Sequence, residues 1–343
     1  MASLASVALV PLVGPFHTRW PRYTVVHVRE AVKAVAPDVV ALAPLAPGAL
    51  ADPAWQDTDE VALPHTVVPW ARAAGVAVAE VGLRPGEALD PGDVSASQDL
   101  QRFLGQYEAG QARLAQVRAS EAPVRRLLES ALDLRRVGTE LLPAIREHQA
   151  ERERLLGAGP GTEWLEERAA VTATRALGSG GRRIALLAAV DQVPVLEELL
   201  DGRARLVEVP DVDAGEEGRQ RALLDVAMRG DAADVDSLLA SLADLPQPEA
   251  RYHEANLHLA AERQEEALAS LQRLLRLDFV EPYFLPGFAL ARLGQVYDLV
   301  ERRADALKAY RGVLALSYAP AAAVAAATAG LEEPFSLYAP ADG

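Results

Sequence analysis

The sequence predicts an α/β domain with a largely parallel sheet over residues 1–212, followed by an all-helical domain over residues 213–343. In the first part, short apolar runs of strand length alternate with helical patterns, as they do in parallel sheets with helical crossovers. No strand-like run of comparable strength follows residue 209. The last third instead contains two segments that share one helical-hairpin pattern. A chain of 343 residues is long enough to build two separate cores.

The predicted strands are apolar runs bounded by turn residues. They lie at residues 6–13, 39–42, 76–81, 184–190 and 204–209, with helices between them at about 23–35, 66–74, 162–177 and 193–200. Since helices connect successive strands, the strands are expected to run parallel. A long helical region at about 97–156, interrupted near Pro123 and Pro143, is predicted as an insertion into this domain. The acidic, turn-rich segment from Asp211 to Gly218 is the predicted domain boundary.

Composition narrows the classes of function. The formal net charge of -15 argues against nucleic-acid binding, because phosphate contacts need a basic surface. The chain has no cysteine, which excludes disulfides, thiolate nucleophiles and iron–sulfur clusters. No apolar stretch is long and uncharged enough to span a bilayer, and the apolar N-terminus lacks the basic start of a secretory signal. We therefore expect a cytoplasmic protein that binds neither nucleic acid nor membrane.

The helical third contains an internal repeat. Its second copy comprises Leu293, Gly294, Tyr297, Ala306 and Tyr310, and its first comprises Tyr252, Ala255, His258, Ala267, Leu271 and Leu274. Small residues at Gly294 and Ala306 are expected to let two helices approach closely. The pattern resembles the tetratricopeptide repeat, although Ala267 and Ala306 are 39 positions apart, about five more than the usual period. An unrelated helical bundle is the alternative. Residues 321–329 are expected to cap the array.

The tetratricopeptide resemblance implies a concave groove, lined by the first helix of each hairpin, that takes an extended peptide of a protein partner. The matching groove positions are Tyr252, Asn256, Arg292 and Gln295. Asn256 and Arg292 can hydrogen-bond a peptide backbone or a carboxylate. The alternative is that these are solvated polar residues without a ligand.

The N-terminal segments VPLVGPFHT, at residues 10–18, and APDVVAL, at residues 36–42, resemble the opening of the TraB/GumN/Tiki-like superfamily, which is related to the ChaN and erythromycin-esterase-like folds. Members begin with a strand, a Gly-x-x-His turn, a helix and a second strand. Further along, the run that ends at Glu80 resembles the third strand of the family, which ends in an acid. The segment that ends at Arg168 resembles the helix that carries its arginine. The resemblance covers roughly residues 7–209.

This resemblance implies a hydrolytic metal site of two histidines and a carboxylate, from which the chain departs. His17 stands at the first histidine position, but Ala43 replaces an expected glutamate, and Asp191 ends a second motif that has lost its glycine and histidine. The catalytic candidates are therefore His17, Glu80, Arg168 and Asp191.

Two functions follow. We expect a scaffold that binds a protein or peptide through its helical repeats, with an inactive N-terminal domain that holds no metal or cofactor. In that case His17 caps a strand end. The alternative is a hydrolase of the peptidase or esterase class, in which His17 and nearby carboxylates hold a divalent transition metal, Mn or Fe, and the repeats recruit the substrate.

Overall fold

The computed structural model describes residues 4–84, 87, 91–157, 159, 163–230, 234–277 and 282–337. The chain divides into two compact units. The first comprises Met1–Trp55 and Asp59–Gly218, and the second comprises Gln56–Thr58 and Arg219–Gly343. The division falls inside helix α9 (Gly215–Arg229), whereas the sequence predicts it ahead of this helix, after residue 212.

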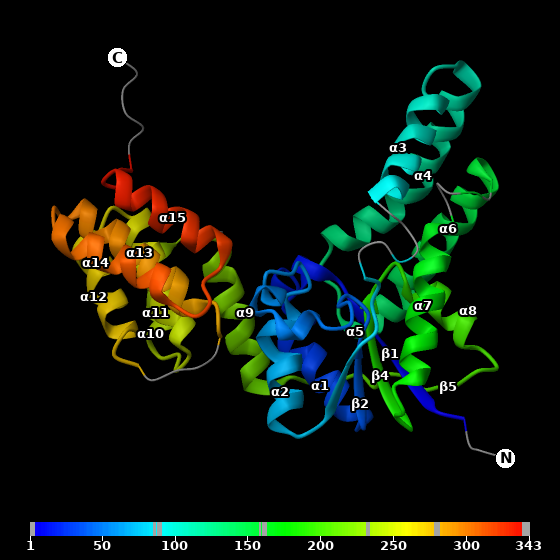
Figure 1. The fold of residues 1–343 in the computed structure, drawn as a ribbon, viewed down its shortest axis with the longest axis horizontal. Helices are drawn as coiled ribbons and strands as arrows, with labels where there is room; N and C mark the ends of the chain where they lie inside the picture. The colour runs from blue at the N-terminus through cyan, green and yellow to red at the C-terminus, as the bar shows by residue number, and fades with distance from the viewer. Residues whose placement is uncertain are drawn as a thin grey trace. The chain divides into compact units, whose positions relative to one another are not determined.

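The first unit is built on a five-stranded parallel sheet (Figure 1). Its strands are β1 (Ser6–Leu12), β2 (Val39–Leu42), β3 (Ala77–Glu80), β4 (Arg183–Ala189) and β5 (Arg205–Leu206), in the order β3-β2-β4-β1-β5. Each pair is parallel, as predicted. The central strands are buried on both faces, which explains why they read as continuous apolar runs in the sequence.

β5 is much shorter than the predicted strand at 204–209. It pairs with β1 only at Ser6 and Val7. Pro11 has no N–H to donate toward a longer β5, but the ladder ends before it, at Val7, and Leu9 between them keeps its N–H.

Helices cover the faces of the sheet. They are α1 (Val25–Val35), α2 (Val68–Ala73), α7 (Trp164–Gly178) and α8 (Val193–Leu200), with short 3-10 turns at Gly14–Thr18, Ala49–Ala51 and Pro53–Gln56 and a π-helical turn, η4 (Leu63–Val67). Thr24 and His27 form a reciprocal capping box at the start of α1. One large core joins the strands to these helices.

The predicted insertion is a set of helices that extends away from the sheet in Figure 1. It consists of α3 (Pro91–Leu104), α4 (Glu108–Glu129), α5 (Leu134–Arg136), the π-helical turn η5 (Val137–Leu141) and α6 (Leu142–Leu156). α4 packs against α6. Neither proline interrupts the helix that contains it: α4 continues through Pro123, and α5, η5 and α6 follow one another without a gap through Pro143. The predicted interruptions near Pro123 and Pro143 are therefore wrong.

In the described part of the second unit, every regular element is a helix. After α9 come α10 (Val235–Ala243), α11 (Pro248–Ala260), α12 (Gln264–Leu274), α13 (Leu285–Leu299), α14 (Arg303–Ala315) and α15 (Ala321–Glu332). α11 packs on α12 and α13 on α14, which makes two successive helical hairpins, and α15 packs on α13 and α14.

Tyr310 is the centre of the second hairpin. It is fully buried, and its ring occupies the space left by two glycines. A Cβ atom added at Gly294 on α13 or at Gly330 on α15 would lie 2.3 Å from a ring atom of Tyr310. Ala306 is also fully buried beside this ring. The small residue at Gly294 thus makes room for the aromatic side chain of the second helix.

Candidate functional site

His17 lies in the 3-10 turn that follows β1 and is completely buried. Its Nδ1 donates a hydrogen bond to the Tyr23 carbonyl (2.8 Å), and its Nε2 accepts one from the Val13 N–H (3.2 Å). Burial lowers the pKa of His17 to about 4, so the ring stays neutral at physiological pH. A metal ligand needs an imidazole lone pair, and the lone pair of this ring is engaged by backbone.

Tyr23, which follows this turn in the chain, packs against it. Its hydroxyl donates to the Pro11 carbonyl (2.6 Å), and its ring packs edge-on against His17 with 4.9 Å between ring centroids. Burial raises the pKa of this phenol well above its usual range. His17 and Tyr23 together fix the chain where it leaves the sheet.

Glu80, the second predicted catalytic residue, binds backbone as well. It ends β3, and its carboxylate accepts the N–H groups of Gly48 (2.7 Å) and Leu50 (2.5 Å). This is the geometry of a carboxylate that holds the 3-10 turn Ala49–Ala51 against the sheet edge.

Arg168 and Asp191 are electrostatic neighbours. Arg168 lies on α7 and Asp191 follows β4 at the carboxyl edge of the sheet. Asp191 is exposed as a whole residue, but desolvation of its carboxyl group by the surrounding protein raises its pKa. The positive charge of Arg168 opposes this rise. Both residues were among the four predicted catalytic candidates, without being predicted as a pair. Among the described residues, no group of three or more His, Asp or Glu side chains is arranged to hold a metal ion.

Glu60 also lies at the carboxyl edge of the sheet, and it was not among the residues predicted from the sequence. Its carboxylate accepts the Gly14 N–H (3.1 Å), so it binds the turn that carries His17. Burial raises the pKa of Glu60 to about 7, and the nearby charges of Asp191 and Asp59 add to the rise. A carboxyl group that titrates near neutrality is suited to general acid–base chemistry. No motif marks it, since Glu60 lies in a loop 46 positions from its partner Gly14.

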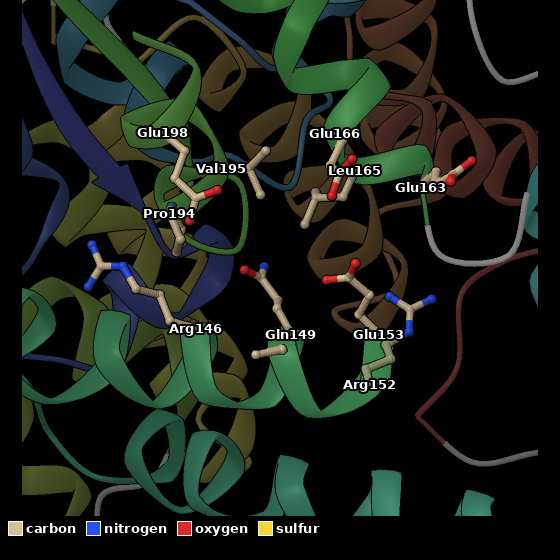
Figure 2. Close-up of a pocket in the computed structure, with 11 residues that line it drawn as sticks. Arg146, Gln149, Arg152, Glu153, Glu163, Leu165, Glu166, Pro194, Val195 and Glu198 are labelled. Atoms are coloured by element: carbon tan, nitrogen blue, oxygen red, sulfur yellow. The ribbon is translucent and has the colours of Figure 1, made fainter. Parts of the chain in front are cut away.

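A pocket of about 290 Å³ lies among α6, α7 and α8 (Figure 2). Figure 2 shows Gln149 and Glu153 of α6 pointing across it toward residues of α7 and α8. Gln149 also donates to the Asp191 carbonyl (2.7 Å), which ties this pocket to the carboxyl edge of the sheet. Its lining carries both signs of charge, and Arg146 in it forms an ion pair with Glu197, which lies outside this pocket.

In the second unit, the four predicted peptide-binding residues lie on α11 and α13. Tyr252 and Asn256 are on α11, and Arg292 and Gln295 are on α13. The Tyr252 ring lies 6.5 Å from the ring of Phe288 on α13, so the two first helices of the hairpins are neighbours. Arg292 donates to the Gln295 side-chain oxygen (2.9 Å).

Two of these side chains bury polar atoms that lack a hydrogen-bond partner in the described structure. They are Oδ1 of Asn256, an acceptor in this orientation, and Nε of Arg292, a donor. A buried group without a partner costs about 1–3 kcal/mol, and native proteins contain few of them. Both atoms are inaccessible to solvent in this structure, so neither can meet a ligand unless its side chain turns outward. As whole residues, Asn256, Arg292 and Gln295 are nevertheless partly exposed.

Comparisons with models of known protein families, with curated proteins and with solved structures give no match. Among the described residues, no helix is long and apolar enough to cross a membrane.

Proposed function

We propose that this protein is a scaffold that binds an extended peptide of a partner protein in the groove lined by α11 and α13, on a tetratricopeptide-like repeat. The observation that carries the proposal is that α11 and α13, the first helices of two successive hairpins, lie next to each other and keep Asn256, Arg292 and Gln295 partly exposed. Amide and guanidinium groups at such positions can donate hydrogen bonds to peptide carbonyls.

The helical arrangement supports the repeat. α11 with α12 and α13 with α14 form successive hairpins, and α15 lies at the end, where such arrays need a cap. The glycine and the aromatic residue of the pattern, Gly294 and Tyr310, are in direct contact.

We propose further that the first unit is a TraB-like scaffold without hydrolytic metal chemistry, working in the cytoplasm. The support is the hydrogen bonding of His17 and Glu80, whose polar atoms hold backbone groups. Both residues have a structural task that would persist without any substrate.

A hydrolase is the second candidate, and one observation favours it. Glu60 has a pKa of about 7 and lies electrostatically close to Asp191 at the carboxyl edge of the sheet, where open α/β folds place their sites. Such an enzyme would rely on these carboxyl groups for proton transfer. Loss of a measured hydrolytic activity in Glu60→Gln, with the fold intact, would favour this function over the scaffold.

The proposed scaffold function is tested by affinity capture from the native source with the full chain as bait. The groove variant Arg292→Met keeps the length and packing of the side chain but removes its donors. Arg311→Met, which changes an exposed arginine on α14, is the matched control. We expect a partner that the parent and the control retain and that Arg292→Met loses. A set of captured proteins that is the same for all three baits would contradict the proposal.

A further inference from the structure

A second pocket, of about 470 Å³, runs beside β1 in the first unit. This volume is in the usual range of ligand sites, about 300–1,000 Å³. Val7, Leu9 and Pro11 of β1 form one wall, since alternate residues of a strand share a face of the sheet. Leu134 and Leu142 line it from the insertion. Its side is lined by Leu206 of β5 and by residues that follow this strand: Val207, Glu208, Val209 and Asp211. We call this pocket the β1 groove.

On the side of this groove, β1 has no neighbouring strand beyond Val7 among the described residues. The Leu12 carbonyl accepts from Val190 toward β4 (2.8 Å), whereas the Val7 carbonyl accepts from Val207 toward β5 (2.9 Å). Because hydrogen-bonding direction alternates along a strand, Leu9 also faces the β5 side. In the described chain, no backbone hydrogen bond joins Leu9 to residues 207–211, because β5 has ended.

Because of Pro11, only one residue on this edge of β1 can exchange two backbone hydrogen bonds with an added strand. Pro11 has no N–H, and its carbonyl already accepts from the Tyr23 hydroxyl (2.6 Å). Leu9 alone therefore offers both a donor and an acceptor to an incoming chain. An added strand that continues the direction of β5 would place one residue opposite Leu9, with that side chain pointing into the apolar groove.

The charged side chains at the rim of the groove favour a particular charge on the residues that flank such a strand. Glu208 and Asp211 are exposed, and no ion pair to either is found among the described residues. Glu197, which also lines the groove, is already paired with Arg146, and Arg135 is the cation of the opposite rim. Carboxylates thus outnumber free cations beside the open edge, which favours a basic partner.

We propose that the β1 groove binds an extended apolar peptide segment flanked by basic residues, which adds as a short parallel strand at Leu9. An unpaired strand edge is a template for such addition, and main-chain hydrogen bonds then provide affinity while side-chain pockets provide specificity. This site is in the first unit and is separate from the helical groove of α11 and α13.

The test uses the full chain and a capped peptide, acetyl-Lys-Val-Leu-Val-Lys-amide, followed by calorimetry and by amide exchange measured at single residues by NMR. We expect saturable binding and new protection of the Leu9 amide. The same peptide methylated at the amide that follows its leucine, or with glutamate for both lysines, is expected to bind at least about tenfold more weakly.

Two protein variants locate the site. Gly138→Leu fills the groove from η5, where an added Cβ meets nothing within 4 Å, and Gly178→Leu is the matched control at another open helical glycine. Glu208→Lys reverses a rim charge, and Glu129→Lys on α4 is its control. Only Gly138→Leu and Glu208→Lys are expected to weaken binding, by about tenfold or more.

Three results would overturn the proposal. They are absence of binding up to the solubility of the peptide, equal affinity for Gly138→Leu and the parent, and a Leu9 amide that is already protected without peptide. The last result would show that residues 207–211 close the groove themselves.

Discussion

The two ring nitrogens of His17 hold the turn that ends β1, one bound to Val13 and the other to Tyr23. Glu60 reaches the same turn through the Gly14 N–H. At the residue scale, the carboxyl edge of the sheet is thus a small network of side chains that bind backbone. Within it, His17 is kept neutral and Glu60 is kept protonated to unusually high pH by burial.

The first prediction concerns His17→Ala. At pH 7 it should lower the free energy of unfolding by about 1–3 kcal/mol, since two buried backbone groups lose their partner. The folded state keeps His17 neutral down to a pKa of about 4, whereas the unfolded chain protonates it near 6.5. The parent therefore loses stability as pH falls from 6.5 to 4, and its advantage over the variant shrinks in that window. Urea unfolding across this range checks it; a constant difference would contradict it.

Glu60→Gln should act in the opposite direction. Glutamine keeps an acceptor for the Gly14 N–H but cannot ionise. The pKa of Glu60 rises from 4.5 to about 7 in the fold, so the unfolded chain releases its proton first and the parent loses stability as pH rises between these values. Above pH 7 we expect the variant to be more stable by about 1–3 kcal/mol, with no such gain below pH 4.5. Thermal unfolding at both pH values measures it; a variant less stable at pH 8 would refute the assignment.

The family resemblance singled out His17 and Glu80, but a motif match does not specify hydrogen-bond partners. Glu80 ends a strand, as the family resemblance implies, yet its carboxylate holds Gly48 and Leu50. Glu60 was not predicted, because its contact with Gly14 arises only when distant loops fold together.

At the scale of elements, apolar runs predicted the strands well because β1 and β4 are buried on both faces. The prediction was too long for β5, where the apolar residues Leu206 and Val207 are exposed. Apolar character cannot distinguish a paired strand from an extended segment. Pro11 removes a donor only at the far end of this edge, beyond Leu9, so no proline marks the point where β5 ends.

Tyr310 provides the third prediction, because it packs between α13 and α15. Gly330→Ala puts a methyl group 2.3 Å from its ring and should cost about 1–3 kcal/mol through overpacking. Gly312→Ala on α14 is the control. Its new Cβ would lie 3.4 Å from Leu290, an ordinary contact, so the higher helix propensity of alanine should leave stability equal or raised by up to about 1 kcal/mol. Equal melting temperatures for the two variants would contradict the packing described for Tyr310.

At the scale of the whole molecule, the two units have separate cores: one built on the sheet and others within the helical hairpins. The change from strand patterns to helical patterns predicted this organisation. It could not predict the burial of Asn256 Oδ1 and Arg292 Nε, since burial of individual atoms depends on how α11 and α13 pack. The proposed peptide-binding function rests on the partly exposed residues Asn256, Arg292 and Gln295 of α11 and α13.

The most direct test of that function is a calorimetric titration of the captured partner segment into the parent and into Arg292→Met. Arg292→Met removes a buried donor that has no partner, Nε, together with one side-chain hydrogen bond, from Nη1 to Gln295, so the melting temperature should change little. Affinity for the segment should nevertheless fall by about tenfold or more, because a hydrogen bond to a charged donor is lost from the complex. An unchanged dissociation constant in Arg292→Met would contradict peptide binding in the groove of α11 and α13.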